Sequence, residues 1–154
     1  MDMQLYFNAV MSEIKSEAKA KAESKGAMSG YSLIAKLSKF NNYQEVIIRL
    51  DNEYFTEDVI SNFVCDSWRG SYDLPAISYD KVGNTHLCTI DEIINNINNS
   101  HGKEVTGYKG GNFVLSMNDI LYIANDGDSN YSTAIVDIIE ENGVIVCITK
   151  TDMY

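Results

Sequence analysis

The amino-acid sequence predicts an α+β fold in which N-terminal helices and one mid-chain helix pack on a C-terminal antiparallel β-sheet. Three observations favour this fold class. Apolar residues recur at three- and four-residue steps near the N-terminus, Thr89 and Glu92 form a capping-box pattern in mid-chain, and β-branched runs flank Asn142-Gly143 near the C-terminus. The 154 residues, 45% of them hydrophobic, are enough to bury a core without disulfides or metal.

The N-terminal region is expected to form two helices. Over residues 2–25 one face is apolar, and Lys25-Gly26 is a typical helix end. The residues of that face are Met3, Phe7, Val10, Ile14 and Ala18. This face either packs internally or pairs with a second copy of the chain, as a homodimer through the N-terminal helix. A second helix is expected over residues 32–40, where one face carries Leu33, Ile34, Leu37 and Phe40.

The middle of the chain is predicted to contain two strands and two helices. Residues 44–50 and 76–79 favour strands. Thr56, followed by Glu57 and Asp58, is typical of a helix N-terminus, so a short helix is expected over residues 56–65. The Thr89 capping box begins a further helix, which Gly102 ends.

The remainder of the chain is predicted to be β-structure. The expected strands cover residues 103–108, 112–116, 120–124, 132–140 and 144–149. The last two flank Asn142-Gly143, a residue pair favoured in type I′ turns, so an antiparallel hairpin is expected there.

Charge divides the chain into two parts. Residues 1–40 contain six basic and four acidic residues, whereas residues 41–154 contain six basic and 18 acidic residues. We therefore expect a basic helical N-terminal segment (1–40) and an acidic α+β domain (41–154). A net charge of −10 argues against direct binding to nucleic acid or to anionic membranes. It favours a partner protein with a basic groove.

The sequence favours a cytoplasmic protein that is not an enzyme and holds no cofactor or metal. Three widely spaced cysteines fit neither a disulfide scaffold nor a zinc site, and the N-terminus lacks a signal-peptide pattern. No catalytic motif is recognisable, and no apolar run approaches the ~18 residues of a membrane span. The segment beginning Asp126-Gly127-Asp128 partly matches a calcium loop, but Tyr131 replaces the required glycine, which favours a polar turn.

Two aromatic, glycine-rich segments, residues 67–72 and 107–113, form a candidate ligand site. Its candidate binding residues are Trp68, Arg69, Tyr72, Tyr108, Lys109 and Asn112. Together they would offer an anion-binding fork and an aromatic wall, which suit a nucleotide. Alternatively, the aromatic residues fill the core and the cations pair with nearby carboxylates.

Three segments resemble small uncharacterised accessory proteins of tailed bacteriophages: S-W-R-G-S-Y-D-L-P-A-I (67–77), G-Y-K-G-G-N-F (107–113) and L-Y-I-A-N-D-G-D-S (121–129). The resemblance spans roughly residues 60–150 and brings no catalytic residue with it. It implies a protein that acts in the cytoplasm of an infected bacterium, where small acidic accessory proteins block host defence enzymes.

Two functional hypotheses follow. In the first, the protein is a non-enzymatic inhibitor of a host defence nuclease or CRISPR-type effector, whose basic groove it occupies through Asp126, Asp128, Glu140 and Glu141. In the second, it binds or sequesters a nucleotide between the segments 67–72 and 107–113.

Overall fold

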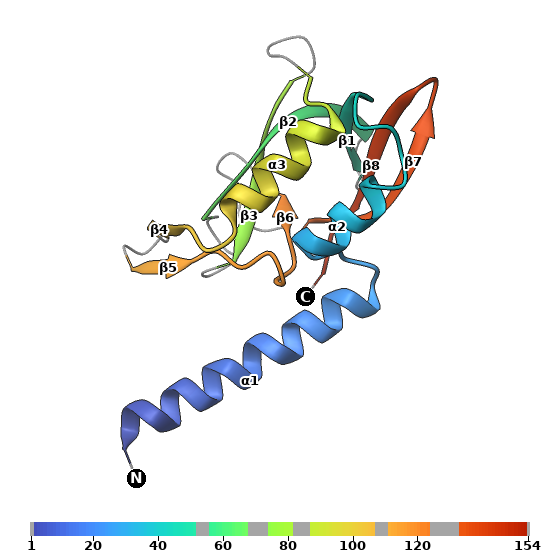
Figure 1. The fold of residues 1–154 in the computed structure, drawn as a ribbon. Coiled ribbons are helices and arrows are strands. Elements are labelled where there is room, and N and C mark those ends of the chain that lie inside the picture. The colour runs from blue at the N-terminus through green and yellow to red at the C-terminus, as the bar shows by residue number, and fades with distance from the viewer. Residues whose placement is uncertain are drawn as a thin grey trace.

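The computed structural model describes residues 2–51, 56–67, 74–81, 87–106, 111–123 and 133–153. Its helices and strands are, in order, α1 (Met3–Ser24), α2 (Gly30–Leu37), β1 (Val46–Asp51), β2 (Thr56–Ser67), β3 (Pro75–Lys81), α3 (Ile90–Ser100), β4 (Glu104–Thr106), β5 (Asn112–Val114), β6 (Tyr122–Ile123), β7 (Ala134–Glu141) and β8 (Val144–Lys150). The α+β class is therefore confirmed (Figure 1).

The main sheet curls into a closed barrel of strand order β1-β2-β3-β6-β7-β8, and β4 and β5 form a separate two-stranded sheet. Most pairings are antiparallel, as expected, but β1 with β8 and β3 with β6 are parallel. The sheet also draws on the middle of the chain, because β1, β2 and β3 all precede α3. Pairing β1 with β8 closes the sheet on itself.

The predicted helix over residues 56–65 is wrong, because this segment belongs to the strand β2. Its first residues pair with β1 in antiparallel register, Asp58 opposite Arg49 and Val59 opposite Ile48. Val59 is buried beside Ile48, whereas Asp58 is exposed and faces the cation. Thr56 bonds the Asp51 carboxylate across the strand pair and does not cap a helix. Pairing between strands thus outweighs the local helix-start pattern.

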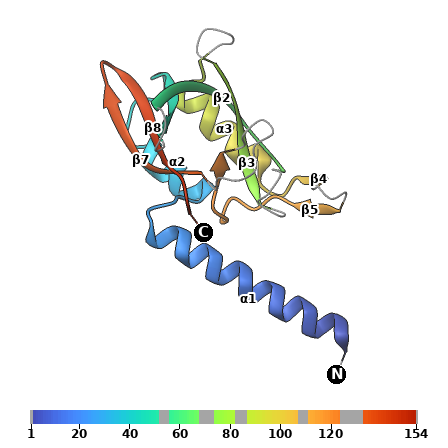
Figure 2. The ribbon, with the colours of Figure 1, turned by 180° about the vertical axis from the view of Figure 1, so that it is seen from behind.

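Helix α1 begins and ends where the sequence predicts. Asp2 caps its N-terminus by accepting a hydrogen bond from the Gln4 N–H at 2.9 Å. Gly26 follows the helix at φ +96°, a conformation that favours glycine. Within α1 the buried residue is Ala22, near the C-terminal end. The N-terminal half extends away from the rest of the protein (Figures 1 and 2).

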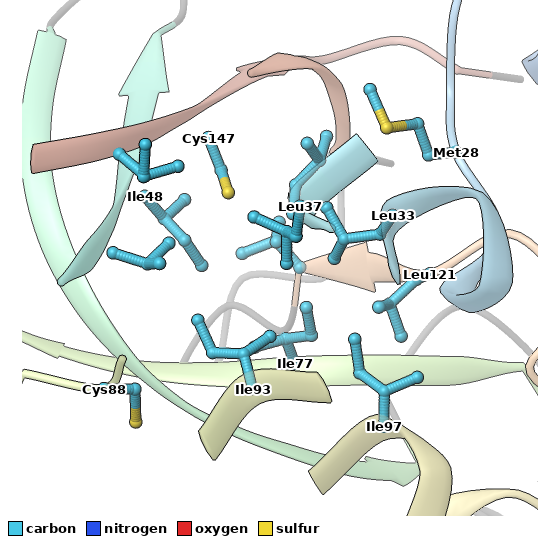
Figure 3. Packing of buried hydrophobic residues seen from close by; sticks show 14 of the residues in the cluster. Met28, Leu33, Leu37, Ile48, Ile77, Cys88, Ile93, Ile97, Leu121 and Cys147 are labelled. Carbon is cyan, nitrogen blue, oxygen red and sulfur yellow. The ribbon is translucent and has the colours of Figure 1, made fainter. Parts of the chain in front are cut away.

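Helices α2 and α3 complete the main hydrophobic core. Leu33 and Leu37 of α2, and Ile93 and Ile97 of α3, are fully buried. They point toward side chains of the barrel strands such as Ile48 (Figure 3). The core therefore takes side chains from both sides of residue 40, where the charge of the chain changes sign.

The Thr89 cap and the hairpin turn agree with their predictions, whereas α2 is shifted toward the N-terminus. Ser29 caps α2, so this helix starts two residues before the predicted position and ends three residues before it. Thr89 caps α3 and accepts a hydrogen bond from the Glu92 N–H at 3.3 Å. Asn142 and Gly143 have φ of 52° and 82°, the two positive values that a type I′ turn requires.

Candidate functional site

One short segment, residues 42–45, holds the N-terminus of α3 and the β7–β8 turn together at one end of the protein. The Asn42 and Gln44 carbonyls accept hydrogen bonds from the Asp91 and Ile90 N–H groups, at 3.0 and 2.9 Å. These bonds fix the N-terminus of α3 beside the segment. On its other side, the Glu45 carbonyl accepts a hydrogen bond from the Ile145 N–H at 2.9 Å, which fixes the β7–β8 turn.

This arrangement gathers exposed carboxylates that are far apart in the sequence. We call them the acidic end, and its members are Glu45, Asp91, Glu92, Glu140 and Glu141. The two carboxylates of α3 lie in its first turn, where the helix dipole stabilises negative charge. Of the other three, Glu45 directly precedes β1, and Glu140 and Glu141 are the last residues of β7. The acidic end is thus built on backbone that is hydrogen-bonded on both sides.

Arg49 ties one carboxylate of the acidic end to the neighbouring strands. Its guanidinium donates to both oxygens of Asp58, at 2.7 and 3.2 Å, and to both oxygens of Glu141, at 3.0 and 2.9 Å. These hydrogen bonds lower the pKa of Glu141 and raise that of Arg49. The charge of Glu141 is therefore largely compensated, because bidentate pairing of this kind is strong for an exposed site.

The Arg49–Glu141 pair also spans one strand on the outer surface of the barrel. Arg49 is on β1 and Glu141 on β7, and β8 runs between them. On β8, Arg49 is paired with Ile148 and Glu141 with Val144, so the ion pair passes over Val146, midway between them. Val146 lies on the outer face of the barrel beside Ile47 and is only 1% exposed. The ion pair thus has a structural role: it covers an outward apolar side chain and joins three strands.

Glu140 is hydrogen-bonded to a neutral amide, in contrast to Glu141, which is paired with a cation. Its carboxylate accepts a hydrogen bond from the neutral Gln44 amide, which also donates to the Gly143 carbonyl at 3.2 Å. The amide orients the carboxylate without neutralising it. Of the two described residues that the sequence nominates for partner binding, Glu140 therefore offers the more available charge.

Most of the other nominated residues lie outside the described part of the chain. These are Trp68, Arg69, Tyr72, Tyr108, Lys109, Asp126 and Asp128. Asn112 is described: it is exposed at the start of β5, and its side-chain oxygen accepts a hydrogen bond from Thr106 at 3.1 Å. The nucleotide site remains a prediction.

The described cysteine and histidine side chains have structural environments. Burial raises the pKa of the Cys147 thiol to about 12 and also raises that of Cys88, which disfavours the thiolate. The His101 Nδ1 accepts a hydrogen bond from the Met117 N–H at 3.1 Å, and its ring packs 5.3 Å from that of Tyr31. His101 therefore ties Met117 and Tyr31 together, and the two thiols are members of the hydrophobic core.

A groove of about 520 Å³ lies between α1 and the segment before β6. Its lining is mostly polar and comprises Asn8, Met11, Ser12, Lys15, Ser16, Lys19 and Asp119. Burial raises the pKa of Asp119, and the positive charges of Lys19 and Lys15 oppose this effect. The groove shows which side of α1 faces the rest of the protein.

Sequence reasoning missed Glu45, Asp91 and Glu92 as members of a common surface. Each of the three lies at or near the start of a predicted element, and this position was the available signal.

Among the described residues, no three His, Cys, Asp or Glu side chains are grouped so as to hold a metal ion. No described helix combines the length and the apolar character needed to cross a membrane. Comparison of the chain with protein-family models, with curated proteins and with solved structures gave no match.

Proposed function

We propose that the protein is a bacteriophage accessory protein that inhibits a host defence nuclease or CRISPR-type effector. It does so by docking its acidic surface in the basic groove of that enzyme, in competition with nucleic acid, and it catalyses no reaction itself. The observation that carries the proposal is the acidic end, where five exposed carboxylates from three separate stretches of the sequence lie at one end of the protein.

The geometry of the acidic end supports docking in two ways. Its backbone is held by hydrogen bonds from α3 and from the β7–β8 turn, so little ordering is required on binding. Because Arg49 compensates Glu141, the exposed negative charge is carried by Glu45, Asp91, Glu92 and Glu140. Of these, Glu92 also accepts a hydrogen bond from the Thr89 hydroxyl at the N-terminus of α3. The cations Lys36 and Lys39 precede the segment 42–45, and they limit the strength of the negative field there.

An interaction of this kind depends strongly on ionic strength. Exposed charges are screened beyond the Debye length, which is about 8 Å at physiological salt. Complementary charge at the rim of an interface mainly raises the association rate and excludes partners of the wrong sign. Inhibition should therefore weaken as salt rises.

The test uses matched triple variants of the full chain. The first, Glu45→Gln/Asp91→Asn/Glu140→Gln, removes three of the five carboxylates of the acidic end. It leaves intact Glu92, which belongs to the α3 capping box, and the Arg49 ion pairs. The second, Glu13→Gln/Glu17→Gln/Glu104→Gln, changes the net charge equally at exposed positions elsewhere. Cleavage of a labelled DNA duplex by a panel of purified bacterial nucleases, CRISPR-type effectors included, is measured with each protein at about 50 and about 300 mM salt.

We expect the wild-type protein to inhibit at least one nuclease, more strongly at low salt. The first variant should inhibit about tenfold less well, because exposed ion pairs contribute about 0.2–1 kcal/mol each and 1.4 kcal/mol is a factor of ten. The second variant should match the wild type. Equal inhibition by the two variants, or inhibition unaffected by salt, would contradict the proposal, as would failure of the wild type against the whole panel.

A further inference from the structure

Helix α1 presents a continuous row of large apolar side chains to solvent. We call this row the α1 stripe, and it consists of the exposed Met3, Tyr6, Phe7, Met11 and Ile14, with the half-buried Val10 between them. Met3 is 80% exposed, and Phe7 and Ile14 are 57% and 52% exposed. At 100° per residue these positions span about 140° of the helix surface, the width of a face that normally packs against protein.

The stripe faces away from the protein's own body. The side of α1 that borders the groove toward Asp119 carries Asn8, Ser12, Lys15, Ser16 and Lys19, with Met11 at its edge. An amphipathic helix that belonged to the local core would be oriented the other way round. Contact with the body is instead concentrated at the C-terminal end, where Ala22 is buried in a small cluster with Ala76 and Tyr122.

Two copies of the stripe provide enough area for a specific interface. At about 200 Å² for a fully exposed side chain of this size, the exposed fractions of Met3, Tyr6, Phe7, Met11 and Ile14 correspond to about 550 Å² on one chain. Two chains would therefore bury about 1,100 Å², which exceeds the roughly 1,000 Å² expected of a specific interface. A second copy also supplies an apolar face of the same length, as a two-fold symmetric contact requires.

The charges near the stripe favour protein over lipid as its occupant. The stretch that carries the stripe, residues 2–14, contains Asp2 and Glu13 and no Lys or Arg, and the lysines of α1 begin only at Lys15. Helices that lie on membranes carry cations along the polar face beside their apolar residues. The net charge of −10 further opposes an anionic bilayer. Repulsion between the two acidic bodies of such a pair would be weak. The helix residues from Ile14 to Lys25 rise about 16 Å and separate each body from the stripe by about twice the Debye length.

We propose that the protein forms a homodimer in which the α1 stripes of two copies pack against each other. The body, with its acidic end, then stands clear of the dimer interface. This proposal is independent of the inhibitory function, since it concerns α1 and not the acidic end.

The test measures the mass of the full chain in solution. Light scattering and sedimentation velocity are run from about 1 to about 100 µM, a range that detects micromolar dissociation constants. The stripe variant is Phe7→Gln/Ile14→Gln. The control variant, Leu5→Gln/Tyr43→Gln, removes two large apolar side chains that are 67% and 76% exposed but lie outside the stripe. Circular dichroism checks that each variant keeps its fold.

We expect the wild type and the control to approach twice 17.2 kDa at the upper concentrations, and the stripe variant to remain a monomer throughout. A monomeric wild type at the highest concentration would overturn the proposal, and so would a stripe variant that still dimerises. Co-sedimentation with phosphatidylcholine vesicles and with vesicles containing phosphatidylserine is measured in parallel. Binding to either by a monomeric wild type would assign the stripe to a lipid surface.

Discussion

Thr149 replaces a backbone hydrogen bond at the point where the parallel pairing of β1 and β8 ends. The last paired residues are Arg49 and Ile148. One residue further along, the Thr149 hydroxyl donates to the Arg49 carbonyl at 2.8 Å and accepts from the Asp51 N–H at 3.3 Å. The Thr149 side chain is 3% exposed, so water cannot readily substitute for it.

The substitution Thr149→Val isolates the contribution of this hydroxyl. Valine has almost the same shape, so the cavity term is small and the loss is that of the two hydrogen bonds. Leaving a buried polar group unsatisfied costs about 1–3 kcal/mol, and we expect the free energy of unfolding to fall by that amount. For a chain of this size, a loss of about 2 kcal/mol lowers Tm by about 4–8 °C.

The assay is urea unfolding at pH 7, followed by circular dichroism, together with thermal melts. Thr149→Ser keeps the hydroxyl and loses one methyl group, which should cost about 0.5–1.5 kcal/mol. Thr106→Val serves as the surface control, because Thr106 is exposed and its hydroxyl bonds another exposed side chain. If Thr149→Val were as stable as the wild type, the closure of the barrel would not depend on this hydroxyl and our reasoning would be refuted.

Three further predictions concern the hairpin, one ion pair and one thiol. Gly143→Ala should destabilise the protein by about 1–2 kcal/mol in urea, because φ at this position is +82°, whereas Asn142→Gly should have a much smaller effect. Glu141→Gln should lower stability at pH 7, because pairing with Arg49 depresses the pKa of Glu141 below its usual 4.5. This contribution is present above pH 4.5 and is lost as pH falls through the depressed pKa, so the variant and the wild type should converge in urea titrations as the pH is lowered. Cys147, whose pKa is raised to about 12, should react with iodoacetamide at pH 8 only after unfolding, as peptide mass spectrometry would show.

Each of these predictions can be contradicted directly. An alanine at position 143 that preserved stability would mean that the turn tolerates another geometry. If the stability difference between Glu141→Gln and the wild type stayed constant from pH 7 to pH 3, the effect of the substitution would not come from the Arg49 ion pair. Rapid labelling of Cys147 in the folded protein would show that its surroundings open readily.

Local chemistry made several elements predictable from the sequence. The limits of α1 follow from Asp2 and Gly26, and the start of α3 follows from the Thr89 cap. Asn142-Gly143 defines the β7–β8 hairpin because few other residue pairs tolerate two positive φ values. In all these cases the determining interactions lie within a few residues of one another.

The error at β2 arose where local and distant interactions conflict. Thr56, Glu57 and Asp58 have the composition of a helix start, and no neighbouring residue argues against it. The antiparallel pairing with β1 buries Val59 and brings Asp58 to Arg49. This pairing depends on residues that a local pattern does not include, and it determines the outcome.

The sequence by itself determined the local elements, the acidic balance of residues 41–154 and the existence of an apolar row on the first helix. Only the tertiary structure decided that Glu45 and Asp91 join Glu140 at one end, that Arg49 compensates Glu141, and that the α1 stripe faces away from the body. The physical reason is that periodicity and capping act within a few residues of the chain. The meeting of distant charges is set by backbone hydrogen bonds and core packing, which form only when the whole chain folds.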